Sequence, residues 1–118
     1  MSITAIAGLT AEDYIPEIDK DSDEPTSFKL KPLSGVHYMS IMAEVTDLGD
    51  GESRITGNGL RLAIKHGLVG WDNFNDAQGI KMKFNPVNVK KIPPAILTEL
   101  AGEIISRSEV GGEQIKNS

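Results

Sequence analysis

The stretch from Gly59 to Ile105 constrains the fold of this chain most strongly. It contains the only tryptophan and two of the three phenylalanines. Two helix patterns form its ends: the first runs from an N-cap at Thr56 to about His66, and the second runs from Pro94 to about Ser108. Each pattern keeps its apolar side chains on one face, so we expect two helices that pack against one core.

The apolar residues of this stretch predict the composition of that core. The two stripes comprise Leu60, Ala63 and Ile64 in the first helix and Leu97, Leu100, Ala101 and Ile104 in the second, widened by Ile96 and Ile105. The expected structural anchors are Trp71, Phe74, Leu60 and Ile64. Trp71 has the largest apolar area and suits a core position, whereas an exposed Trp71 would mark an interface. Gly67 is placed to end the first helix in the left-handed conformation.

Weaker patterns surround this stretch. Residues 28–31 and 80–84 alternate apolar and polar side chains, which predicts two short strands that pair with one another or form hairpins. Ser34 is the expected N-cap of a helix over about 35–46, and Asn85 of a short helical turn over 87–91. We therefore expect a mainly α fold with a small β-hairpin or two short strands, in a single compact domain with flexible termini.

Charge divides the chain into a tail and a domain. Residues 1–27 hold seven acids and one base, a net charge of −6, whereas residues 28–118 hold ten acids and eleven bases, a net charge of +1. We expect residues 1–25 to form an acidic, flexible arm, 26–108 a helical globular domain, and 109–118 a mobile tail. The arm is either a solvated leader or a segment that folds onto a basic partner. Because acidic surfaces repel phosphates, the charge argues against nucleic-acid binding.

Composition also argues against a membrane protein, a cofactor and an enzyme. The chain has no cysteine, which excludes disulfides and thiolate metal sites, and its apolar runs are too short to span a membrane. The acidic loop at 47–52 lacks the ligand spacing of an EF-hand, and Gly57-Asn58-Gly59 lacks the lysine of a phosphate loop. His37 and His66 lie far apart in the sequence. We expect no metal, cofactor or catalytic residue.

Two helix faces are candidate partner-binding surfaces. Methionine adapts to irregular surfaces, so the residues around Met39 suit either core filling or a flexible docking surface. The second face is any part of the last helix that the core leaves uncovered. The candidate partner-binding residues are Val36, Met39, Met42, Leu97, Leu100 and Ile104.

Three sequence blocks resemble the small tail assembly chaperones of long-tailed bacteriophages. In order along the chain they are Pro25–Leu33, Gly59–Phe74 and Ile92–Ile104, and they are distributed over residues 25–108. The resemblance implies a mostly helical, non-enzymatic protein of the host bacterial cytoplasm. Such a protein coats the tape measure protein and helps recruit tail-tube subunits during tail assembly. The implied partners are the tape measure protein, the tail-tube protein, a frameshifted longer form of the same chain and further copies of itself.

Two other functions compete with this expectation. A structural tail or neck component that stays in the virion would be rich in strands, which the predicted helices disfavour. An acidic inhibitor that mimics nucleic acid would need acids across a folded surface, whereas here they gather in the predicted arm.

Overall fold

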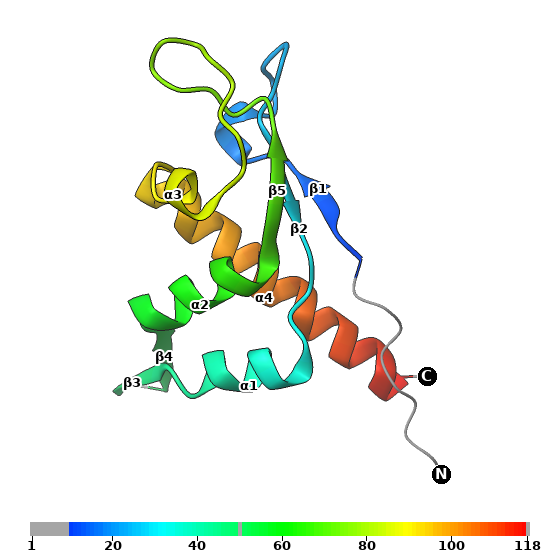
Figure 1. Ribbon diagram of the computed structural model, residues 1–118. Helices are drawn as coiled ribbons and strands as arrows, with labels where there is room; N and C mark the ends of the chain where they lie inside the picture. The colour runs from blue at the N-terminus through cyan, green and yellow to red at the C-terminus, as the bar shows by residue number, and fades with distance from the viewer. Residues whose placement is uncertain (1–9, 50, 118) are drawn as a thin grey trace.

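The computed structural model describes residues 10–49 and 51–117, which form helices and strands in nearly equal number (Figure 1). In chain order these are β1 (Glu12–Tyr14), the 3-10 helix η1 (Glu17–Asp19), β2 (Ser27–Leu30), α1 (Gly35–Met42), β3 (Val45–Gly49), β4 (Glu52–Ile55), α2 (Gly57–Gly67), β5 (Leu68–Asp72), α3 (Pro86–Val89) and α4 (Pro94–Asn117). Of the described residues, 44% lie in helices and 21% in strands, so the fold is mixed α/β. The prediction of a mainly α fold was wrong because β1, β3, β4 and β5 lie where composition indicated an arm, loops or a turn.

A three-stranded antiparallel sheet holds β2 between β1 and β5. Phe28 lies opposite Trp71 of β5 and opposite Tyr14 of β1, and Phe28 and Leu30 point into the core. The strand predicted at 28–31 is therefore confirmed, with a partner other than the one expected. Residues 80–84 form no strand; they make one isolated bridge, Asn75 to Lys81, in a turn that contains Gly79 at φ +80°.

The helix starts agree with the sequence. Ser34 Oγ accepts a hydrogen bond from the backbone N–H of His37 at 3.3 Å, and Thr56 Oγ1 accepts one from Gly59 at 3.2 Å. Both are N-caps of the predicted kind. Helix α1 ends at Met42, earlier than expected, because the chain turns at Ala43 into the hairpin β3–β4. The loop predicted at 47–52 lies within that hairpin, although Asp50 is outside the described residues.

Helices α2 and α4 pack closely at Gly67. A Cβ atom on this glycine would lie closer than 3.0 Å to three side-chain carbons of Ile104. Gly67 does not have a positive φ, so the predicted left-handed helix end is wrong. The position instead needs glycine because α4 passes directly against it.

Parts of both predicted tails are folded. Strand β1 pairs with β2, Tyr14 Oη donates to Glu99 Oε2 of α4 at 2.5 Å, and the backbone N–H of Glu17 donates to the same oxygen at 3.0 Å. These contacts hold residues 12–19 on the domain, while residues 1–9 are outside the described part. At the other end, α4 continues past the predicted end at Ser108 to Asn117; Ser118 is not described.

Candidate functional site

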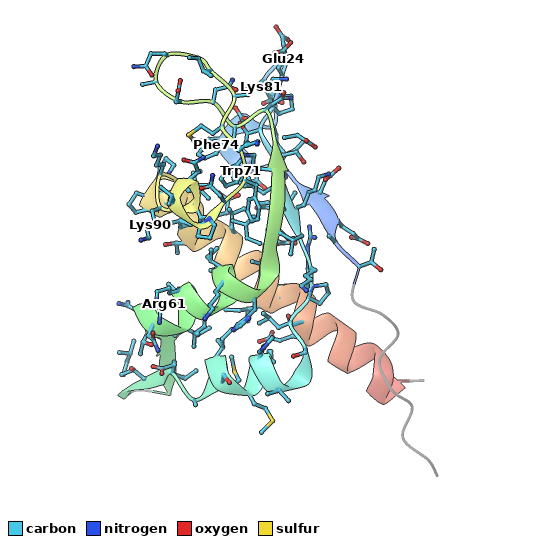
Figure 2. All side chains as sticks on the ribbon, viewed as in Figure 1. Glu24, Arg61, Trp71, Phe74, Lys81 and Lys90 are labelled. Carbon is cyan, nitrogen blue, oxygen red and sulfur yellow. The ribbon has the colours of Figure 1, made fainter. Side chains whose placement is uncertain are left out.

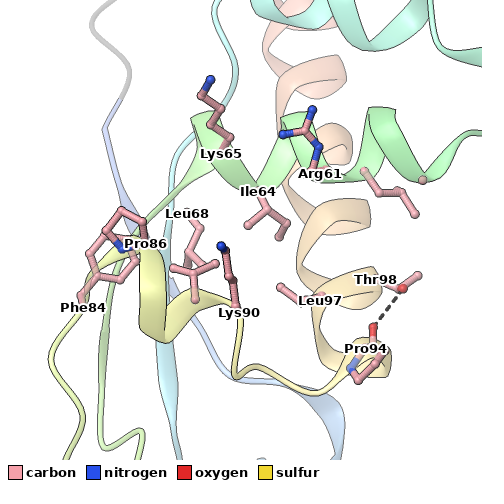
Figure 3. Close-up of a pocket in the computed structure, with 13 residues that line it drawn as sticks. Arg61, Ile64, Lys65, Leu68, Phe84, Pro86, Lys90, Pro94, Leu97 and Thr98 are labelled. Atoms are coloured by element: carbon pink, nitrogen blue, oxygen red, sulfur yellow. Dashed lines mark hydrogen bonds between the residues drawn. The ribbon is translucent and has the colours of Figure 1, made fainter.

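An apolar groove of about 650 Å³ opens between α2, α3, the first turns of α4 and the start of β5 (Figure 3). It is lined by Gly57, Leu60, Arg61, Ile64, Lys65, Leu68, Phe84, Pro86, Val89, Lys90, Pro94, Leu97 and Thr98. This volume is typical of cavities that take a ligand or a few side chains of another protein. We refer to these residues as the groove.

The floor of the groove is made of aliphatic side chains from three elements. Leu60 and Ile64 lie one turn apart on α2, and they line the groove together with Leu97 of α4 and Val89 of α3. Leu60 and Leu97 are only partly buried, so the core leaves some of this apolar surface uncovered. The groove exists because α3 is only four residues long and covers this apolar face incompletely.

An aromatic cluster forms one wall. Phe84 is 41% exposed and lies edge-on to Trp71, with ring centroids 4.9 Å apart. The indole N–H of Trp71 donates to the carbonyl of Met82 at 2.8 Å, and Trp71 also meets Phe28 and Phe74 edge-on. Figure 2 shows Trp71 beside Phe74. Because Trp71 is held on all these sides, it gives Phe84 a firm support at the groove.

Three cations border this apolar surface. Arg61 and Lys65 lie one turn apart on α2, and Lys90 extends from the end of α3 towards α2 (Figure 3). Arg61 donates to the amide oxygen of Asn58 at 2.8 Å. None of the lining residues is acidic, and none of the three cations takes part in an ion pair found within the described residues. The groove is therefore apolar with a positive rim, in a chain whose net charge is −5.

The structure separates the predicted partner-binding residues into three groups. Val36 and Met39 are 74% and 72% exposed on α1, whereas Met42 is partly buried against the core. Leu97 lines the groove. Leu100 and Ile104 are fully buried and cannot reach a partner without unfolding of the domain. They were candidates only where the core left the stripe of α4 uncovered, and the core covers both of them.

The predicted anchors all belong to the core or to its edge. Trp71 and Ile64 are buried, and Phe74 and Leu60 are partly buried against the core. The expectation of an anchoring Trp71 is confirmed. Ile64 and Leu60 also line the groove, which the sequence analysis did not anticipate.

Several groove residues escaped the sequence analysis. Arg61 and Lys65 were visible as a pair of cations at i and i+4, next to the apolar pair at 60 and 64. That pattern could have indicated a basic border. Phe84, Pro86 and Lys90 carried no such signal, because their position depends on how residues 73–92 fold back onto α2.

The structure also brings together two histidines that lie far apart in the sequence. His37 and His66 stack with ring centroids 3.7 Å apart. Among the described residues, no group of three or more histidine, aspartate or glutamate side chains is arranged to hold a metal ion. In the same part of the chain, each helix is too short or too polar to cross a membrane.

Comparison of the chain with protein-family models, with curated proteins and with solved structures gives no match. The geometry of the groove is therefore the main basis for a functional proposal.

Proposed function

We propose that this protein is a non-enzymatic tail assembly chaperone of long-tailed bacteriophages. In this role it binds and solubilises the tape measure protein in the host cytoplasm and helps recruit tail-tube subunits. The observation that carries the proposal is the open apolar groove between α2, α3 and α4. The groove suits protein binding because it offers apolar surface with a charged border.

The groove suits an amphipathic helix as its ligand. A tape measure protein is long and helical before assembly, so its apolar stripes need temporary cover. Helices bind such grooves through apolar side chains spaced one turn apart. A cavity of about 650 Å³ takes a few side chains rather than a long helix. Several copies would therefore be needed along one partner.

The resemblance supports the same location. Two of the three resembling blocks form groove walls: Gly59–Phe74 supplies α2 and β5, and Ile92–Ile104 supplies the start of α4. The exposed apolar residues of α1, Val36 and Met39, form a second and smaller surface for the same partner.

Co-expression with the tape measure protein of the same phage tests the proposal. We expect a soluble complex that elutes in gel filtration with several copies of this protein per partner. An Arg61→Glu, Lys90→Glu double substitution should weaken the complex, because it reverses the charge of the rim without touching the core. Ile80→Asp, on an exposed loop outside the groove, is the matched control.

Each outcome separates the candidate surfaces. If the tape measure protein stays insoluble and this protein elutes alone, the chaperone proposal is wrong. Loss of the complex with Met39→Glu, but not with the rim double substitution, would move the binding surface from the groove to α1.

A second candidate is a tail or neck component that stays in the virion. The observation in its favour is the strand content of 21%, which is higher than the sequence predicted. Mass spectrometry of purified virions distinguishes the two, because a chaperone leaves the tail and a structural component remains at stoichiometric level.

A further inference from the structure

One exposed apolar side chain lies in the most acidic part of the folded chain. Ile18 of η1 is 84% exposed, more than any other large apolar side chain in the described part. Its sequence neighbours Glu17, Asp21, Asp23 and Glu24 are exposed acids. The only base between residues 10 and 27, Lys20, is paired with Glu17 at 2.8 Å. Ile18 is therefore an apolar projection within a negative surface.

Hydrogen bonds hold this projection in a fixed shape. The backbone N–H of Glu17 donates to Glu99 of α4 at 3.0 Å, which fixes the start of η1. The Asp19 carboxylate accepts from the backbone N–H of Thr26 at 2.5 Å and from the Ser22 hydroxyl at 2.7 Å. Fixing the loop in advance lowers the entropy cost of using Ile18 in a contact.

The groove has the opposite character. It is an apolar concavity whose rim carries Arg61, Lys65 and Lys90, and it contains no acid. Residues 12–24 do not line the groove of their own copy. In Figure 2, Glu24 lies at one end of the molecule, well away from Arg61. The projection and the groove are thus complementary in charge and both apolar at their centres, and they do not contact each other within one copy.

We propose that the groove of one copy binds the η1 projection of a second copy. Ile18 inserts between the aliphatic side chains of the floor, and the acids around it face Arg61, Lys65 and Lys90. The two surfaces differ, so the contact is heterologous. Each pair of copies therefore keeps one free groove and one free projection. Further copies can bind at these two sites, so the protein assembles head to tail.

This contact regulates the groove of the proposed chaperone. A second copy and the tape measure protein exclude one another from the same apolar surface. Self-association would therefore cover the groove until the partner arrives. This competition rests on the proposed function, whereas the self-association does not.

Sedimentation velocity of the purified full-length protein over a range of concentrations tests the contact. We expect association that grows with concentration and weakens as salt screens the charges. Ile18→Asp should raise the dissociation constant by about tenfold or more, as expected for a side chain at the centre of an interface. Ile80→Asp is the matched control, because Ile80 is also strongly exposed but lies outside the groove and the η1 projection, so it should leave association unchanged.

A mixing experiment tests the head-to-tail geometry. Ile18→Asp leaves a copy with a working groove, and the Arg61→Glu, Lys90→Glu double substitution leaves a copy with a working projection. We expect each variant to be monomeric alone and their equimolar mixture to form a dimer. Arg54→Glu, an exposed charge reversal outside the groove, should associate like the original protein.

Three results would overturn the proposal: an original protein that stays monomeric at every concentration, an Ile18→Asp variant that associates normally, or a mixture that forms no dimer. Binding of the Ile18→Asp variant to the tape measure protein is measured separately. If that variant is monomeric and binds no partner, the proposed function fails while the self-association stands. If the original protein is monomeric and binds the partner, the self-association fails while the proposed function stands.

Discussion

The imidazole rings of His37 and His66 lie face to face, with centroids 3.7 Å apart and planes tilted by 11°. His37 belongs to the first turn of α1 and His66 to the last turn of α2, so the stack connects the two helices. Two protonated rings at this distance would repel one another strongly. A proton on His66 is therefore disfavoured in this arrangement.

Acid should weaken the fold through His66. Burial, followed by the positive charges of His37, Lys65 and Lys31, lowers the pKa of His66 below its usual value of 6.5. The folded protein then binds a proton less readily than the unfolded chain. The contribution to the free energy of unfolding is complete above pH 6.5 and is lost as the pH falls through the lower folded pKa. Denaturant unfolding at about pH 7.5 and about pH 5.5 measures it.

His66→Gln is the control for this pH effect. It should reduce the difference in unfolding free energy between the two pH values, because glutamine does not titrate. Hydrogen bonds from Thr26 and Ser22 lower the pKa of Asp19 below 3.8, so its contribution is lost only in stronger acid. An unchanged pH dependence in the His66→Gln variant would contradict the assignment.

Removal of the Glu99 carboxylate should release the N-terminal strand. Tyr14 Oη and the backbone N–H of Glu17 both donate to this carboxylate. Burial and the nearby Glu99 raise the pKa of Tyr14, so its hydroxyl stays protonated and donates throughout the neutral range. We expect Tyr14→Phe to cost about 1 kcal/mol of unfolding free energy and Glu99→Ala to cost more, since it removes the oxygen that accepts both hydrogen bonds.

Hydrogen exchange distinguishes local release from general loss of stability. In Glu99→Ala, the amides of β1 should exchange faster while those of α2 keep their protection, because only η1 and β1 depend on this carboxylate. Uniform acceleration over the whole domain would show that Glu99 has a different role. The same variant should weaken self-association, because it loosens the loop that carries Ile18.

Alanine substitutions at two glycines should change the free energy of unfolding in opposite directions. Gly67→Ala forces a methyl group against Ile104, so we expect a loss of about 1–3 kcal/mol of unfolding free energy. Gly102 lies on an exposed part of α4, and a Cβ there meets nothing within 4 Å. Gly102→Ala should stabilise the helix by about 0.5–1 kcal/mol. Urea unfolding of both variants measures the difference in sign.

Local sequence rules predicted the parts of this fold that depend on neighbouring residues. Ser34, Thr56 and Asn85 each accept a hydrogen bond from the backbone three residues later, as their positions indicated. The apolar faces of α2 and α4 were also predicted, because a helix presents its stripe whatever it packs against.

Parts that depend on distant partners could not be predicted in the same way. Strand β5 contains Gly70 and became a strand because β2 lies beside it. The sequence leaves Ile104 as a candidate partner-binding residue, because it does not show that Gly67 lies against this side chain. The groove draws on α2, α3 and α4 together, and no single segment of the sequence shows that it exists.

The fluorescence of Trp71 should report what occupies the groove. Trp71 is the only tryptophan, is 8% exposed, and lies edge-on to Phe84 at the groove wall. We expect Phe84→Ala to admit water to the indole and to shift its emission to longer wavelength. An apolar ligand that fills the groove should reverse this shift, because it excludes water from the space left by the ring. Ile80→Asp, outside the groove, should leave the emission unchanged; a shift in Phe84→Ala that no groove ligand reverses would place the binding surface elsewhere.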